Sequence, residues 1–203
     1  MHRTMTDMER ELALALWKLR VVRTDPIGVT LEGLPEMQLR TIATLAARCI
    51  QFMTTEKRIM FDAVAGVPGE GTALAEALAL LTGKSCIEGL GLWGEDANQK
   101  VTLVKKVPAG VKHTLIVSGV LYDGKVEGAT FDILRMNFGK PGYIVVLVDH
   151  ELGGPEELIY RPKCYRNPDS LFNVSDLLMF GQQENFVDAE AQDAVEEYLT
   201  AQF

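Results

Sequence analysis

Two stretches of the chain combine glycine with polar residues in the manner of phosphate-binding loops. The first, Gly66–Gly71, reads GVPGEG and separates a short apolar run from an alanine- and leucine-rich segment. Its three glycines permit a tight bend, and the N–H groups at the start of a following helix attract anions. A plain strand–helix turn that uses glycine for its geometry explains the same residues. No lysine follows the last glycine, so the stretch is not a P-loop of the GxxxxGK[ST] type.

The second stretch, Leu115–Arg135, reads LIVSGVLYDGKVEGATFDILR. An apolar run gives way to a polar turn that contains Gly124 and Lys125, and a segment of helical periodicity follows. Strand–loop–helix units of this kind commonly hold a phosphate in α/β proteins. Lys125 supplies a positive charge, but composition alone leaves phosphate binding and a structural turn equally open.

Helical periodicity marks the segments that would hold these loops. Asp7 has the character of a capping residue in an acidic first turn, and Gly83 is a natural C-cap. A short helix capped by Ser175 and an amphipathic helix from Asp188 are expected later in the chain. The predicted helices cover residues 7–20, 35–53, 71–83, the second half of 115–135, part of 168–180, and 188–203.

Apolar runs between these helices predict strands. Residues 114–117 and 143–149 are typical of buried strands, the second almost continuously apolar, as in a parallel strand covered on both faces. Shorter strands are expected within residues 27–35, 58–68 and 85–94, and a hairpin or flap follows before residue 114. Strands that alternate with helices predict an α/β fold with a mainly parallel, twisted sheet. Its ligand sites would lie beyond the carboxyl ends of the strands.

The composition favours a globular protein of one domain. The 203 residues are 47% hydrophobic and 24% charged, and no repeat or linker divides them. A formal net charge of −8 argues against binding to nucleic-acid backbones. No apolar run reaches membrane-spanning length, and the acidic start does not resemble a signal peptide. Cys49, Cys86 and Cys164 are widely spaced and typical of reduced thiols, so we expect a cytoplasmic protein.

Four segments, in the right order along the chain, resemble the type I phosphoribosyltransferases and within them the orotate phosphoribosyltransferases. Residues 61–84, FDAVAGVPGEGTALAEALALLTGK, resemble that family's AGVPYGGIPLATALSLLTGK. Residues 115–135 align without a gap to its LLVDDVITTGGSILEAVEALR. VVLVDHELGG at 145–154 is similar to VVLVDREEGG, and SLFNVSDLL at 170–178 to SVFTLSELL. The likeness covers about residues 12–178.

The resemblance implies a Rossmann-like phosphoribosyltransferase fold with an N-terminal hood (about 1–35), a core (about 36–155) and a C-terminal hood and helix (about 156–203). It also implies a homodimer and a pentosyltransferase that uses magnesium and the activated sugar PRPP in pyrimidine nucleotide synthesis. In the family, the first loop contacts pyrophosphate, and the second strand end and its turn hold the ribose and the 5′-phosphate. The implied ligand-binding residues are Gly66, Val67, Pro68, Gly69, Glu70 and Gly71, then Ser118, Gly119, Tyr122, Asp123, Gly124, Lys125 and Val126, with His150 on the base side.

The chain departs from the family pattern at positions that carry charge. Ser118 and Gly119 stand where the family has adjacent acidic residues that hold the ribose hydroxyls. YDGKV at Tyr122–Val126 replaces the family's TTGGS. Asp123 in that turn would repel a phosphate unless Lys125 or a metal offsets its charge.

Three more positions differ in charge. EGLGLWGE at residues 88–95 replaces a flexible loop of the basic RKEAKDHG type, and His150 replaces an arginine near the orotate ring. Glu70 puts a carboxylate into the pyrophosphate loop, where it would repel that anion. The candidate substitutes for the lost basic residues are Lys100, Lys105 and Lys106.

These departures lead to two functional hypotheses. Electrostatic stabilisation of a transition state typically contributes several kcal/mol per group. Losing several such groups predicts a diverged protein that binds a nucleotide or another phosphorylated ligand, or acts as a partner or regulator, with weak or no PRPP transferase activity. The alternative is an active phosphoribosyltransferase for orotate or another base, which uses PRPP and magnesium in a rearranged site. The residues by themselves predict no metal site.

Overall fold

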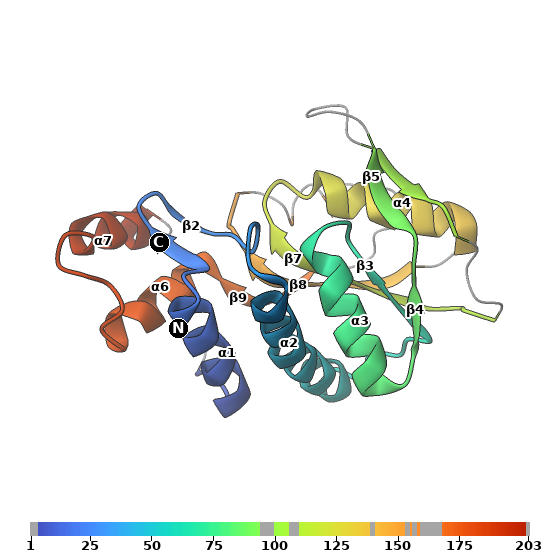
Figure 1. Cartoon of the computed structure of the whole chain (residues 1–203), viewed down its shortest axis with the longest axis horizontal. Helices are drawn as coiled ribbons and strands as arrows, with labels where there is room; N and C mark the ends of the chain where they lie inside the picture. The colour runs from blue at the N-terminus through green and yellow to red at the C-terminus, as the bar shows by residue number, and fades with distance from the viewer. Residues whose placement is uncertain are drawn as a thin grey trace.

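A computed structural model describes residues 4–93, 100–105, 110–138, 141–152, 155, 158 and 168–201. Its centre is a five-stranded sheet in the order β4-β3-β7-β8-β9, and every neighbouring pair in it is parallel. Figure 1 shows the sheet with helices on both faces. The predicted parallel sheet flanked by helices is thus confirmed. The strands are β3 (Ala63–Gly66), β4 (Ser85–Ile87), β7 (Thr114–Leu121), β8 (Pro141–Asp149) and β9 (Asp169–Asn173).

Alternate residues of the strands feed two hydrophobic clusters, one on each face of the sheet. Leu115 and Val117 of β7 pack with residues of helices α2 (Glu36–Glu56) and α3 (Glu70–Thr82). Ile116, between them, packs on the opposite face with residues of α4 (Lys125–Phe138). Because both faces are covered, the inner strands are apolar at nearly every position.

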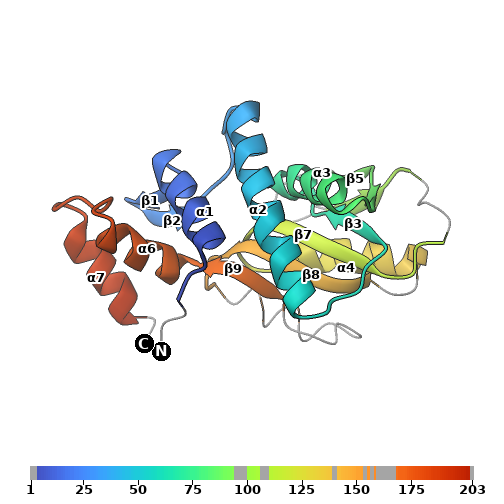
Figure 2. The same ribbon diagram turned by 90° about the horizontal axis from the view of Figure 1, so that it is seen from below.

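The two ends of the chain pack together beside β9. They comprise α1 (Asp7–Lys18), the antiparallel hairpin of β1 (Val22–Thr24) and β2 (Ile27–Val29), α6 (Val174–Gln183) and α7 (Gln192–Ala201). We call this group the hood. Figures 1 and 2 show it at one end of the molecule, away from α3 and α4. Its buried side chains belong to the same hydrophobic cluster as α2 and one face of the sheet, so the hood and the sheet share a core.

Several element boundaries differ from those expected from the sequence. β7 continues past Val117 to Leu121, since Ser118, Val120 and Leu121 still pair with β8. Residues 58–68 form a strand only at Ala63–Gly66. β1 and β9 were not expected: β1 is only three residues long, and β9 lies directly before a helix. α7 begins at Gln192 instead of Asp188.

Candidate functional site

The carboxyl ends of β3, β7 and β8 bring the predicted site residues to one edge of the sheet. Gly66, at the end of β3, pairs with Val117, and Leu121, at the end of β7, pairs with Asp149 of β8. The loop after β3, the loop after β7 and the residue after β8 therefore share one edge, as they do where α/β proteins hold ligands. His150 is tied there directly, since its backbone N–H donates to the carbonyl of Leu121 at 2.8 Å.

The first loop runs closely along β7. A side chain at Gly66 would put its Cβ 2.3 Å from the carbonyl oxygen of Gly71, and one at Gly71 would lie 2.6 Å from the carbonyl oxygen of Val117. The N–H of Val67 donates to that same Val117 carbonyl at 2.8 Å. Val67 and Pro68 are buried. Packing thus accounts for two of the three glycines, as the structural explanation of this stretch predicts.

At the outer end of this loop, Gly69 is exposed and Glu70 is half-buried. Gly69 is the N-cap of α3, with φ at 102°, and Glu70 is its first helical residue. The N–H groups of a first helical turn have no acceptor within the helix, and the helix dipole favours negative charge there. The chain supplies that negative charge itself, as the Glu70 carboxylate.

The second loop, Tyr122–Gly124, has the predicted turn into a helix. Gly124 has φ at 72°, which suits glycine, and α4 begins at Lys125. Asp123 accepts the backbone N–H of Lys125 through Oδ1 at 3.1 Å and its Nζ through Oδ2 at 2.6 Å. The hydrogen bond from the Lys125 side chain lowers the pKa of Asp123. The lysine therefore pairs with the chain's own aspartate in the loop that was predicted to bind a phosphate.

A buried acid that the sequence analysis missed lies under this loop. Ser118 Oγ donates to Glu127 Oε1 at 2.7 Å, and both side chains are buried. Burial raises the pKa of Glu127, the hydrogen bond from Ser118 opposes this, and the carboxylates of Asp123 and Glu70 raise it further. Helical spacing was the available signal, because Glu127 shares a face with Phe131 and Leu134, which are buried on the sheet.

Gly119 leaves room for Glu70 to reach the end of β7. A Cβ at position 119 would lie 2.9 Å from the Cβ of Glu70 and 3.1 Å from Cδ1 of Leu31. It would also lie 3.5 Å from Glu70 Oε2. Glu127 of α4 thus reaches position 118, and Glu70 of α3 reaches position 119. These are the two positions at which the sequence lacks the acidic pair of the family that it resembles.

At this edge of the sheet, Tyr122 and His150 form a contact with the hood. Their rings stack with centroids 4.9 Å apart, and the Tyr122 hydroxyl donates to the carbonyl of Val29 in β2 at 2.8 Å. A Cβ at Gly28 would lie 2.9 Å from His150 Nε2. Nδ1 of His150 is buried without a hydrogen-bond partner in the described part of the chain. Burial raises the pKa of Tyr122, as does the nearby Glu70 carboxylate.

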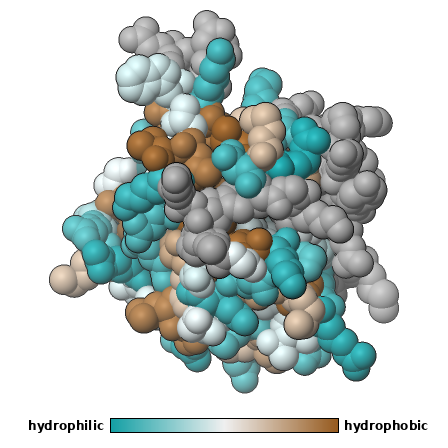
Figure 3. Space-filling view, turned by 90° about the vertical axis from the view of Figure 1, so that its right-hand side faces the viewer, coloured by the Kyte–Doolittle hydropathy of each residue, from teal (hydrophilic) through white to brown (hydrophobic). Residues whose placement is uncertain are grey.

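A hairpin is present, but it begins earlier than predicted. Antiparallel β5 (Leu90–Trp93), from the stretch expected to be a separate strand, pairs with β6 (Lys100–Leu103). Lys105 forms an ion pair with Glu88 at its base, so this candidate substitute already has an acidic partner. Trp93 is 76% exposed and Val104 82% exposed. Figure 3 looks at this end of the molecule and shows hydrophobic atoms gathered near the top of the view. Lys106, Cys164 and residues 94 and 95 lie outside the described residues.

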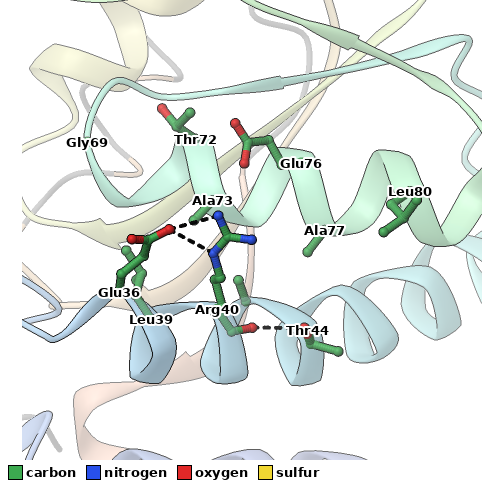
Figure 4. Close-up of a pocket in the computed structure, with 11 residues that line it drawn as sticks. Glu36, Leu39, Arg40, Thr44, Gly69, Thr72, Ala73, Glu76, Ala77 and Leu80 are labelled. Carbon is green, nitrogen blue, oxygen red and sulfur yellow. Dashed lines mark hydrogen bonds and ion pairs between the residues drawn. The ribbon is translucent and has the colours of Figure 1, made fainter.

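A separate pocket of about 500 Å³ lies between α2 and α3. Figure 4 shows Arg40 paired with Glu36 on one wall, both from α2, and Glu76 and Leu80 of α3 on the other. Only Gly69 links this pocket to the loops described above. The predicted phosphate-loop residues are thus gathered at the sheet edge, and this pocket belongs to the outer surface of the two helices.

The described side chains at the sheet edge do not form a ready magnesium site. Asp123 is bound to Lys125, and Glu127 is buried and bound to Ser118. Across the described ranges, no group of three or more His, Cys, Asp or Glu residues is arranged to hold a metal ion. No helix within those ranges is long and apolar enough to cross a membrane.

Solved structures of known proteins resemble this chain in fold. UMP synthase from Leishmania donovani superimposes with a TM-score of 0.65 at 21% identity, over 95% of this chain and 42% of its own, so the chain spans less than half of that protein. Orotate phosphoribosyltransferase from Aeropyrum pernix gives a TM-score of 0.58 at 20% identity, over 83% of this chain and 97% of its own. The Mycobacterium tuberculosis orotate phosphoribosyltransferase, in complex with PRPP, gives 0.56 at 17% identity, over 84% and 98%.

Comparison of the sequence alone identifies no further relative. No protein-family model matches the chain, and no curated protein matches it significantly. The structural likenesses nevertheless extend over nearly the whole of two orotate phosphoribosyltransferases. They agree with the parallel five-stranded sheet and its flanking helices. The chain therefore has the type I phosphoribosyltransferase fold.

Proposed function

We propose that the protein binds a small phosphorylated ligand, such as a nucleotide, at the carboxyl edge of its sheet and transfers phosphoribosyl groups from PRPP weakly or not at all. The observation that carries this proposal is the loop between β7 and α4. It keeps the turn at Gly124 and has a lysine at the first helical residue, but it also holds Asp123 against that lysine.

Binding is supported by the loop and by the fold. A helix N-terminus with a lysine beside it attracts a phosphate through its N–H groups, its dipole and the ammonium charge. Solved structures of the same fold include the M. tuberculosis enzyme in complex with PRPP and in complex with inorganic phosphate. A phosphate that binds here would displace the exposed carboxylate of Asp123 from Lys125.

Weak transfer is supported by the charges around the loops. Lys125 is the only lysine or arginine in residues 66–71 and 118–126, and Asp123 pairs with it. Glu70 adds a second carboxylate beside the site. A departing pyrophosphate develops negative charge, and its departure is favoured by nearby cations, of which these loops supply only the paired Lys125.

Calorimetric titration with PRPP, PRPP plus magnesium, and ribose 5-phosphate tests the proposal, together with a pyrophosphate-release assay over orotate and other bases. We expect binding of a phosphorylated probe that Lys125→Ala weakens about tenfold, and little or no pyrophosphate release. Lys84→Ala, which removes a lysine at the far end of α3, is the matched control. If no probe binds, or if Lys84→Ala weakens binding as much as Lys125→Ala, the proposal of a phosphate site at Lys125 is wrong.

The alternative is an active phosphoribosyltransferase for orotate or another base that uses PRPP and magnesium. The likeness to orotate phosphoribosyltransferases favours it, as does the hairpin of β5 and β6, which carries Lys100. Turnover of PRPP with release of pyrophosphate in the same assay would establish it. Under both hypotheses we expect a homodimer in the cytoplasm. Light scattering on the purified protein tests the dimer.

A further inference from the structure

The side chain of Glu70 reaches from the first loop to the end of β7, close to where the second loop begins. It starts at the first residue of α3 and packs over Gly119 near the end of β7. A Cβ added at position 119 would lie only 2.9 Å from the Cβ of Glu70. Its carboxylate acts electrostatically on Tyr122 in the second loop and on Glu127 beneath it. Glu70 therefore stands between the two loops that a ligand would have to bridge.

Within the described part of the chain, no lysine, arginine or histidine forms an ion pair with Glu70. Asp123, by contrast, is paired with Lys125. Glu70 is half-buried, so its carboxylate is screened less than an exposed one. A polyanion laid across the first loop would meet this charge directly.

A carboxylate in this place distinguishes between kinds of phosphorylated ligand. It accepts hydrogen bonds from hydroxyl groups, and its negative charge strengthens these bonds. The same charge repels a second phosphate. A phosphomonoester with free hydroxyls can put its phosphate at Lys125 and a hydroxyl at Glu70. A diphosphate that spans both loops cannot avoid Glu70.

We propose that Glu70 is a specificity-determining residue, which selects a phosphomonoester with free hydroxyls, such as a sugar phosphate or nucleoside monophosphate, over a diphosphate. The inference rests on the proposed binding of a phosphorylated ligand at this edge. It goes further by naming the ligand class and the residue that selects it.

Calorimetric titration with ribose 5-phosphate and with pyrophosphate, in buffer without divalent cations, tests the selection. We expect the wild-type protein to bind ribose 5-phosphate at least about tenfold more tightly than pyrophosphate. Glu70→Gln keeps the size of the side chain and removes its charge, and it should lower that ratio about tenfold. Glu76→Gln, which removes a carboxylate from α3 on the side of the α2–α3 pocket, should leave the ratio unchanged.

Each outcome is decisive. If the wild-type protein binds pyrophosphate as tightly as ribose 5-phosphate, or if Glu70→Gln and Glu76→Gln change the ratio equally, the selection by Glu70 is overturned. If the wild-type protein binds neither probe, the proposed binding of a phosphorylated ligand fails. If the Glu70→Gln protein also binds no pyrophosphate, the inference about Glu70 fails as well.

A second measurement tests the contact itself, whatever binds. Gly119→Ala should lower the Tm by about 2–8 °C through overpacking against Glu70 and Leu31, and the same change in a Glu70→Gly background should lower it less. Gly91→Ala is the control, because a Cβ there meets nothing nearer than 3.9 Å. An equal loss in both backgrounds would contradict the placement of Glu70 over Gly119 and overturn the inference.

Discussion

Glu127 is a carboxyl group held under the first turn of α4, with Ser118 as its hydrogen-bond donor. Removing an acid from water disfavours its ionised form, and the carboxylates of Asp123 and Glu70 act in the same direction. The pKa of Glu127 is consequently raised despite the hydrogen bond from Ser118. The end of β7 thus combines a buried acid with a raised pKa, Glu127, and the half-buried carboxylate of Glu70.

This raised pKa predicts a pH-dependent stability. The folded state holds the proton of Glu127 more tightly than the unfolded state, where the pKa is near its ordinary value of 4.5. The contribution of Glu127 to stability is therefore fully present below that value and is lost as the pH rises toward the folded pKa. Glu127→Gln keeps an acceptor for Ser118 without the charge, so it should gain on the order of 1 kcal/mol relative to the wild type between pH 4 and pH 7.

Denaturant unfolding at both pH values measures this difference. Glu76→Gln, a change at an α3 residue that lines the α2–α3 pocket, serves as the control and should show no such dependence on pH. A wild-type protein that gains stability relative to Glu127→Gln as the pH rises would contradict the burial of an acid at this position.

The sequence could predict some of these residues and not others. The turn at Gly124 and the loop at Gly66–Gly71 are local, and both were predicted at their observed positions. Glu127 could have been found from its helical spacing with Phe131. The contact of Glu70 with Gly119 could not, because it depends on how β3 and β7 are paired, and no local pattern encodes that register.

At the scale of the elements, the two N-caps predicted at Asp7 and Ser175 are taken by nearby residues of the chain. α1 is capped by Thr6 and not Asp7, since Thr6 N–H donates to Glu9 at 2.8 Å and its Oγ1 accepts the Glu9 N–H at 3.3 Å. Ser175 does not cap α6 either, because it lies inside the helix: the N-cap is Asn173, whose N–H donates to Asp176 at 3.2 Å. The N–H and hydroxyl of Ser175 donate instead to Glu151 at 3.0 and 2.9 Å. The C-cap at Gly83 was predicted correctly, since a positive φ is a local property.

The contact between α1 and α6 depends on a glycine. Trp17 Nε1 donates to the carbonyl of Leu177 at 3.0 Å, and its ring stacks on Phe186. A Cβ at Gly181 would lie 2.1 Å from Cζ2 of this ring. Gly181→Ala should therefore displace the indole and cost about 1–3 kcal/mol of unfolding free energy.

Tryptophan fluorescence and denaturant unfolding measure this effect in a Trp93→Phe background, which removes the exposed second tryptophan. The emission of Trp17 should shift to the red in Gly181→Ala, because a displaced indole is less buried. Gly91→Ala in the same background is expected to leave both the emission and the stability unchanged. An unshifted emission with full stability would mean that α1 and α6 are not packed as described.

At the scale of the whole molecule, three contacts join the hood to the sheet edge and to itself. Glu151, just after β8, accepts from Ser175 of α6, Tyr122 donates to Val29 of β2, and Trp17 joins the two chain ends. The sequence could predict the α/β class from alternation and the phosphoribosyltransferase fold from resemblance. It could not predict these contacts, because each joins residues far apart in the chain.

The contact of Tyr122 ties the hood to the candidate binding loop, so loosening it should affect both. Tyr122→Phe keeps the ring on His150 and removes only the donor to Val29, which should cost about 1 kcal/mol. Amide hydrogen exchange should accelerate in β1 and β2, and less so in α3, which this hydrogen bond does not touch. Since Val29 of β2 contacts Tyr122 in the loop that leads into Lys125, ribose 5-phosphate should dissociate faster from the variant. Unchanged exchange in the β1–β2 hairpin would mean that packing at Gly28 and Leu31 holds the hood on the site without this hydrogen bond.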